Sequence, residues 1–261
     1  MLRCYLVVLT VVAFMTLSAL PAQAADEPAI AAAADLNFAL TEIADLFARE
    51  TKAKVKLSFG SSGNYARQIA EGAPFQLFLS ADEGYVRFLA ERGRTDGEGA
   101  LYAVGRIALF VRAGGKLSAD ATLADLKVAL DDGRLRRFAI ANPEHAPYGR
   151  AAREALQHAG LWERMQPKLV FGENASQAAQ FAASGSAEGG IVPYSLALSP
   201  ALAVLGTSVL LPAAWHAPLN QRMVLIKGAG ETARHFYAFV QEPMARGVLS
   251  RYGFVLPDAT H

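Results

Sequence analysis

The sequence predicts an α/β fold of two lobes, and three observations support this. Short apolar runs alternate with amphipathic helical patterns along most of the chain, an order typical of βαβ units and a mostly parallel sheet. One long extended run, 101–111, is broken only by Gly105 and is placed to cross between lobes. After Pro193 and Ser199-Pro200, an apolar run at 223–226 indicates that the chain crosses back. Two crossings predict a double-crossing hinge between two α/β domains, with a ligand in the interlobe cleft.

The first lobe is predicted from six elements and the segment that returns to it. The elements are strand 28–34, helix 36–50, strand 54–59, helix 62–71, strand 76–80 and helix 82–92. The returning segment adds helices near 231–241 and 243–251. We assign residues 25–104 and 200–261 to lobe 1.

The second lobe, residues 105–199, repeats the same alternation. Its predicted elements are helix 122–129, strand 138–141, helix 148–159, strand 168–171, helix 174–184 and strand 190–192.

Residues 1–24 are typical of a secretory signal peptide. Arg3 gives the charged start, Leu6–Leu20 the apolar core, and Ala22–Ala24 a small-residue cleavage site. A retained membrane anchor is the alternative, but the core is short for a spanning helix. The only cysteine, Cys4, would leave with this segment, so the mature chain has no thiol or disulfide chemistry.

Charge argues against a polyanionic partner. All 24 Asp and Glu lie after the leader, as do 24 of the 25 Lys and Arg, so the formal net charge of the mature chain is zero. No basic stripe interleaved with aromatic residues is present, and we expect no nucleic-acid binding. The chain that remains after cleavage is long enough for two lobes.

Four predicted strand-to-helix junctions share a composition of small, hydroxyl or amide residues and few cations. Backbone N–H groups at a helix start have no intrahelical acceptor and carry the positive end of the helix dipole, so such junctions suit a tetrahedral oxyanion. Each junction alone is also explained as a simple helix cap. Because each lobe has two such junctions, a ligand held between the lobes is favoured. The four junctions are Ala32–Asn37, Gly60–Gly63, Asn142–Gly149 and Gly172–Ser176.

Several of these segments resemble the periplasmic molybdate-binding proteins of ABC importers. The resemblance is carried by SFGSSGNYARQIAEGAP, LFLSAD, ANPEHAPYG and the terminal Arg251–Phe254, and it covers essentially the whole mature chain. It implies the type II periplasmic-binding-protein fold, closing over molybdate or tungstate held by neutral hydrogen-bond donors. It also implies a monomer in the periplasm with a membrane permease and its ATPase as partners, no cofactor, no catalytic residue and no direct protein ligand to the metal.

The resemblance implies three ligand-binding positions at which this sequence does not depart from the family's pattern. The serine of the first lobe corresponds to Ser62, whose hydroxyl and amide are both expected to donate. Amide donors are expected at Tyr148 and Ala175.

Two further positions depart from the pattern. Asp35 occupies a position that is serine in some members, and a carboxylate facing a dianion in a dry cleft costs several kcal/mol. We expect its side chain to turn away and cap its helix at Asn37 or Phe38, so that Asp35 either gives only its backbone N–H or is purely a cap. A tyrosine of some members falls on Pro193; either Tyr194 replaces it or the hydrogen bond is missing.

A site that offers only hydrogen-bond donors also discriminates between oxyanions. Molybdate, tungstate and sulfate are fully deprotonated near neutral pH and only accept hydrogen bonds, whereas phosphate carries a proton that needs an acceptor. Sulfate has to be excluded by its smaller size. A receptor for sulfate, phosphate or a phosphonate is therefore the alternative. A serine hydrolase is a second one, with Ser62 as nucleophile, His145 as base and Glu144 or Asp82 as orienter.

Overall fold

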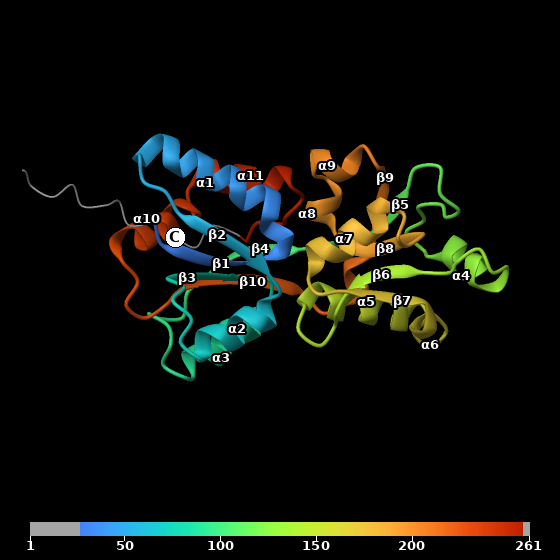
Figure 1. Ribbon diagram of the computed structural model, residues 1–261, viewed down its shortest axis with the longest axis horizontal. Helices are drawn as coiled ribbons and strands as arrows, with labels where there is room; N and C mark the ends of the chain where they lie inside the picture. The colour runs from blue at the N-terminus through green and yellow to red at the C-terminus, as the bar shows by residue number, and fades with distance from the viewer. Residues whose placement is uncertain (1–26, 258–261) are drawn as a thin grey trace, which may run out of the picture.

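The computed structural model describes residues 27–257, and the predicted signal peptide 1–24 lies outside the described residues. Two five-stranded sheets form the centres of two lobes that lie side by side (Figure 1). Helices cover both faces of each sheet, which confirms the predicted two-lobed α/β fold. In the described part of the chain, no helix combines the length and apolarity required to cross a membrane.

The sheet of lobe 1 has the strand order β2-β1-β3-β10-β4. Its strands are β1 (Ala29–Ala33), β2 (Lys56–Gly60), β3 (Leu77–Ser80), β4 (Ala100–Gly105) and β10 (Leu219–Leu225). Its helices are η1 (Ala34–Leu36), α1 (Asn37–Thr51), α2 (Ser62–Ala70), α3 (Glu83–Ala90), α10 (Glu231–Phe239) and α11 (Pro243–Arg251).

Side-chain alternation along the strands places a separate apolar layer on each face of this sheet. In β3, Leu77 and Leu79 pack into the cluster with α1, α10 and α11, whereas Phe78 packs with α2 and α3. Successive residues of a strand point to opposite faces, so a fully apolar β3 requires helices on both sides. Figure 1 shows the two helical layers.

The sheet of lobe 2 has the strand order β7-β6-β8-β5-β9. Its strands are β5 (Ile107–Arg112), β6 (Phe138–Ala141), β7 (Leu169–Gly172), β8 (Gly189–Pro193) and β9 (Gly206–Leu210). Its helices are α4 (Ala124–Asp131), α5 (Pro147–His158), α6 (Trp162–Met165), η2 (Gln166–Lys168), α7 (Ala175–Ser184), α8 (Tyr194–Ala197) and α9 (Pro200–Ala203), followed by η3 (Ala213–Trp215).

The extended run 101–111 crosses between lobes as predicted, because β4 ends at Gly105 in the first sheet and β5 starts at Ile107 in the second. The sheets are mixed rather than mostly parallel. β10 is antiparallel to β3 and β4, and β5 is antiparallel to β8 and β9. These strands enter their sheets directly from the hinge or a short connection, without the crossover helix that a parallel neighbour requires.

The return crossing comes later in the chain than the predicted boundary at residue 200. The unpredicted strand β9 pairs with β5, so the chain leaves the second sheet only after Leu210 and rejoins the first at Leu219. Residues 200–210 therefore lie with lobe 2. The signal for β9, Gly-Thr-Ser-Val-Leu, contains few strongly apolar residues, and only edge pairing makes it a strand.

Candidate anion-binding site

A small cavity lies between the lobes at the carboxyl ends of their parallel strands. Asp35, Ser62, Tyr148 and Ala175, four of the five predicted site residues, line it together, and each is 5% exposed or less. The remaining lining residues come from the same four junctions and from the end of β3: Ala33, Ala34, Gly60, Ser61, Ala81, Ala146 and Pro147.

Helical segments begin around this cavity in both lobes. Ser62 is the first residue of α2, Ala175 is the first of α7, and Tyr148 follows Pro147 at the start of α5. In lobe 1, Asp35 lies in η1, which leads into α1. First-turn N–H groups have no intrahelical acceptor, so these segments bring backbone donors and positive dipole ends to one place.

The start of α7 shows how the local sequence leaves a donor available. Asn174 is extended, with φ −146° and ψ 177°, and its side-chain oxygen accepts from the backbone N–H of Gln177. Asn174 therefore caps the third residue of the helix. This cap does not use the N–H of Ala175, the first residue.

Ser62 is fully buried, and its Oγ accepts a hydrogen bond from the backbone N–H of Ala81 at 3.0 Å. A hydroxyl has one hydrogen to donate in addition to its acceptor lone pairs. The contact with Ala81 uses only the oxygen. The hydroxyl hydrogen of Ser62 therefore remains to be donated.

Asp35 does not cap its helix, and that prediction is wrong. A turn of 3-10 helix comes first, so α1 begins at Asn37, its N-cap is Leu36, and no side chain caps it. Asp35 lies one residue too early to be the cap. Its Oδ2 accepts from Nε2 of Gln221 at 2.7 Å, while the buried Oδ1 has no hydrogen-bond partner among the described residues.

Burial sets the protonation of this carboxyl. It raises the pKa of Asp35 from 3.8 to about 6, although the hydrogen bond from Gln221 and the nearby Tyr148 hydroxyl act in the opposite direction. Burial also raises the pKa of Tyr148 well above its usual value, and the charge of Asp35 adds to this shift. The phenol is therefore a neutral donor near physiological pH.

Sequence reasoning missed Gln221, which connects the site to the hinge. This fully buried residue of β10 donates from Nε2 to the Tyr148 hydroxyl at 2.9 Å, and its Oε1 accepts from the Tyr102 hydroxyl at 2.7 Å. The available signal was an amide on the same strand face as the buried Leu219 and Met223. Gly105 leaves room for this network, because a Cβ there would lie 2.2 Å from the Tyr148 hydroxyl.

Tyr194, the fifth predicted residue, does not line the cavity. Its backbone N–H donates to the carbonyl of Arg106 at 2.9 Å, and its ring packs beside Gly253. Its neighbour Ser195 instead donates from Oγ to the carbonyl of Asp35 at 2.8 Å. Tyr194 thus does not replace the tyrosine that the resemblance places at Pro193.

Direct contacts between the lobes show that the molecule is closed. The N–H of Gly63 donates to the carbonyl of His145 at 3.0 Å, and Ser176 Oγ donates to the carbonyl of Ala34 at 2.8 Å. Nδ1 of His145 contacts Ser61 Oγ at 2.9 Å, so its imidazole is bonded to Ser61 and not to Ser62. The serine hydrolase alternative needs a bond between His145 and Ser62.

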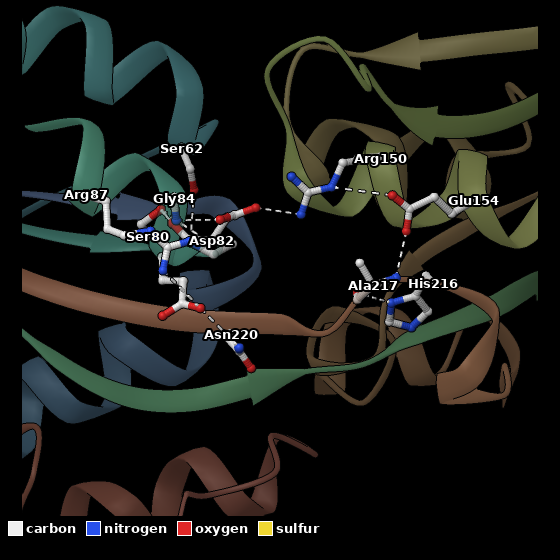
Figure 2. A network of polar contacts seen from close by, with 12 residues as sticks. Ser62, Ser80, Asp82, Gly84, Arg87, Arg150, Glu154, His216, Ala217 and Asn220 are labelled. Carbon is white, nitrogen blue, oxygen red and sulfur yellow. Dashed lines mark hydrogen bonds and ion pairs between the residues drawn. The ribbon is translucent and has the colours of Figure 1, made fainter.

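Arg150 provides a charged contact across the same junction. Its guanidinium lies 2.5 Å from Asp82 of lobe 1 and 3.7 Å from Glu154 of its own helix (Figure 2). Arg150 lines a wider groove beside the cavity, with Arg67 and Arg87. The cavity lining itself contains no Lys, Arg or His. Nowhere in residues 27–257 do three His, Cys, Asp or Glu side chains cluster as a metal site would require.

Comparisons with known proteins agree with this architecture. Residues 29–255 match the model of the family described as bacterial extracellular solute-binding protein. The molybdate-binding protein ModA of Rhodobacter capsulatus is 39% identical over 91% of each chain, and that of Escherichia coli K12 is 34% identical over 86% of this chain and 87% of its own. The structure of the periplasmic molybdate-binding protein of Azotobacter vinelandii superimposes with a TM-score of 0.81 at 31% identity, covering 89% of this chain and all of that one. The chain therefore belongs to the bacterial extracellular solute-binding protein family.

Proposed function

We propose that this protein is the solute receptor of an ABC importer, which binds molybdate, and tungstate as well, and delivers it to a membrane permease with its ATPase. The arrangement of the cavity is the observation that carries the proposal. Helix starts from both lobes surround one cavity whose lining includes no Lys, Arg or His, and the Ser62 hydroxyl is available as a donor. The names of the relatives supply the identity of the anion.

Closure of the lobes would be the functional step, and no covalent bond would be made or broken. A ligand that contacts both lobes stabilises only the closed form. The permease would then distinguish closed from open receptor by shape. On this proposal the protein is a monomeric binding protein rather than an enzyme, and it works in the periplasm after removal of residues 1–24 near Ala24.

One observation favours another oxyanion as a second candidate. The unpartnered Oδ1 of Asp35 could accept the proton that phosphate or a phosphonate carries near neutral pH. Without that contact, a donor-only cavity disfavours a protonated anion by roughly 1–3 kcal/mol.

Calorimetric titration of the purified mature chain with molybdate, tungstate, sulfate and phosphate separates these candidates. We expect tight binding of molybdate and tungstate, with phosphate weaker by roughly 5- to 150-fold, the affinity equivalent of 1–3 kcal/mol. Tight phosphate binding with no molybdate heat would overturn the assignment. Hydrolysis of an ester that disappears in Ser62→Ala would establish an enzyme instead.

A further inference from the structure

We propose that Asp35 is a proton-carrying donor of the closed site: it is protonated in the complex and donates from Oδ1 to an oxygen of the bound anion, so that the protein takes up one proton with each anion. This inference rests on the proposed function. It gives the Asp35 side chain a contact with the anion, whereas the sequence-based expectation was that this side chain turns away as a cap and that only the backbone N–H could reach the anion.

The geometry of the carboxyl supports this assignment. Asp35 lines the cavity at 1% exposure, and Gln221 Nε2 fixes Oδ2 at 2.7 Å. The other oxygen, Oδ1, is buried without a partner. An unpaired buried carboxylate oxygen is costly by itself and more costly beside a dianion, whereas an O–H at the same place can donate to an oxygen that only accepts.

The surroundings contain no cation that would keep Asp35 ionised. The titratable groups that face it are the phenols of Tyr102 and Tyr148, which are neutral because burial, and then the charge of Asp35, raises their pKa values. Among the other elements packed on η1, α7 has no ionisable side chain, α8 has Tyr194, and β2 has the exposed Lys56. On α1, α5 and β10, Glu42 pairs with Arg251, Arg150 with Asp82 and Arg222 with Glu83. The other charged residues of α1, namely Asp45, Arg49 and Glu50, are exposed.

The direction of the pH dependence follows from proton uptake. Burial raises the pKa of Asp35 to about 6 in the closed protein, and a bound dianion would raise it further. Affinity is then constant below about pH 6 and falls by up to about tenfold per pH unit above it, until the pKa of the complex is reached. We expect wild-type affinity for molybdate to fall roughly 10- to 50-fold between about pH 6 and pH 8, since the carboxyl is already half ionised at about pH 6.

The test is calorimetric titration with sodium molybdate, in two buffers of different ionisation enthalpy at about pH 7.5 and then across the pH range. The wild type is expected to take up close to one proton per anion. Asp35→Asn carries its N–H at every pH, so it is expected to show neither proton uptake nor a pH slope. Asp96→Asn removes an exposed carboxylate paired with Arg234 outside the cavity, and is expected to keep the wild-type slope.

Each result has a distinct meaning. Tight molybdate binding by the wild type without proton uptake overturns the role of Asp35 and leaves the proposed function intact. Proton uptake that persists in Asp35→Asn also overturns it, because another group then carries the proton. Absence of molybdate binding by the wild type at every pH overturns the proposed function and this inference with it. The proton count of the wild type needs no variant, so the test stands even if Asp35→Asn does not fold.

Discussion

The two lobes bring different chemistry to the same cavity. Lobe 1 contributes polar side chains, the Ser62 hydroxyl and the Asp35 carboxyl, whereas lobe 2 lines the cavity with Ala146, Pro147, Tyr148 and Ala175. The Tyr148 hydroxyl lies 2.9 Å from Gln221, in the network behind the site. The donors that lobe 2 can offer are therefore backbone N–H groups. Side-chain replacement consequently tests only one half of the site, and the other half has to be tested through the backbone.

The largest effect is expected from Ala175→Pro, which addresses lobe 2. Proline is well tolerated at the first position of a helix, and the extended conformation of Asn174 suits a residue before proline. The substitution removes the N–H and puts the ring in its place, so molybdate affinity is expected to fall by at least about 3 kcal/mol, the upper range for a hydrogen bond to a charged group.

Glu231→Pro is the matched control for this variant, because Glu231 is the exposed first residue of α10 and lies outside the cavity. Calorimetry should give it wild-type affinity. An Ala175→Pro protein that folds and binds molybdate normally would remove the α7 amide from the site.

The next effect concerns the carboxyl of lobe 1 in the unliganded protein. Because folding raises the pKa of Asp35 from 3.8 to about 6, its contribution to stability is complete below about pH 4 and is lost as pH rises through about 6. Ionisation of Asp35 is therefore expected to destabilise the wild type by up to about 3 kcal/mol above pH 7. Asp35→Asn should not show this loss.

Urea unfolding of both proteins at about pH 4 and about pH 7.5 measures the difference directly. The free energy of unfolding of the wild type should fall relative to that of Asp35→Asn as pH rises. Parallel pH profiles would mean that the buried carboxyl titrates normally.

Ser62→Ala tests the hydroxyl donor of lobe 1. Molybdate affinity is expected to fall by roughly 1.5–3 kcal/mol, the range for a hydrogen bond to a charged partner, with some loss of stability because the N–H of Ala81 loses its acceptor. Ser250→Ala, an exposed position on α11, is the control. Unchanged affinity in Ser62→Ala would show that the hydroxyl does not contact the anion.

Gly63→Ala tests the contact between the two halves. A Cβ on Gly63 would lie 2.8 Å from the carbonyl of His145 in the opposite lobe, so it opposes closure. It would also lie 2.8 Å from the Tyr85 hydroxyl of its own lobe, at the end of a side chain that can shift. Affinity is expected to fall by about 1–3 kcal/mol, the usual cost of overpacking. Gly247→Ala on α11, where a Cβ meets open space, is the matched control. If both variants bind equally well, closure does not require the contact between Gly63 and His145.

Much of the fold follows from local pattern. β6 begins and ends as predicted at 138–141, and the crossing at Gly105 was visible because one glycine interrupts an otherwise continuous apolar run. β9 and the antiparallel pairings were not visible, because they depend on where the hinge returns the chain and not on local propensity.

The candidate site also has features that could be predicted from the sequence and features that could not. Ser62, Tyr148 and Ala175 come together because helix starts that follow parallel strands meet at one edge of each sheet. The orientation of the Asp35 side chain could not be predicted, since it depends on a 3-10 turn and on Gln221, which is distant in sequence.

The central claim is that uncharged donors of both lobes bind the anion. A crystal structure of the mature protein with molybdate, located by the anomalous signal of molybdenum, tests it most directly. We predict one peak in the cavity, with oxygens within hydrogen-bond distance of Ser62 Oγ and of the amides of Tyr148 and Ala175. A peak in the neighbouring groove against Arg67, Arg87 or Arg150, with the cavity empty, would contradict the account.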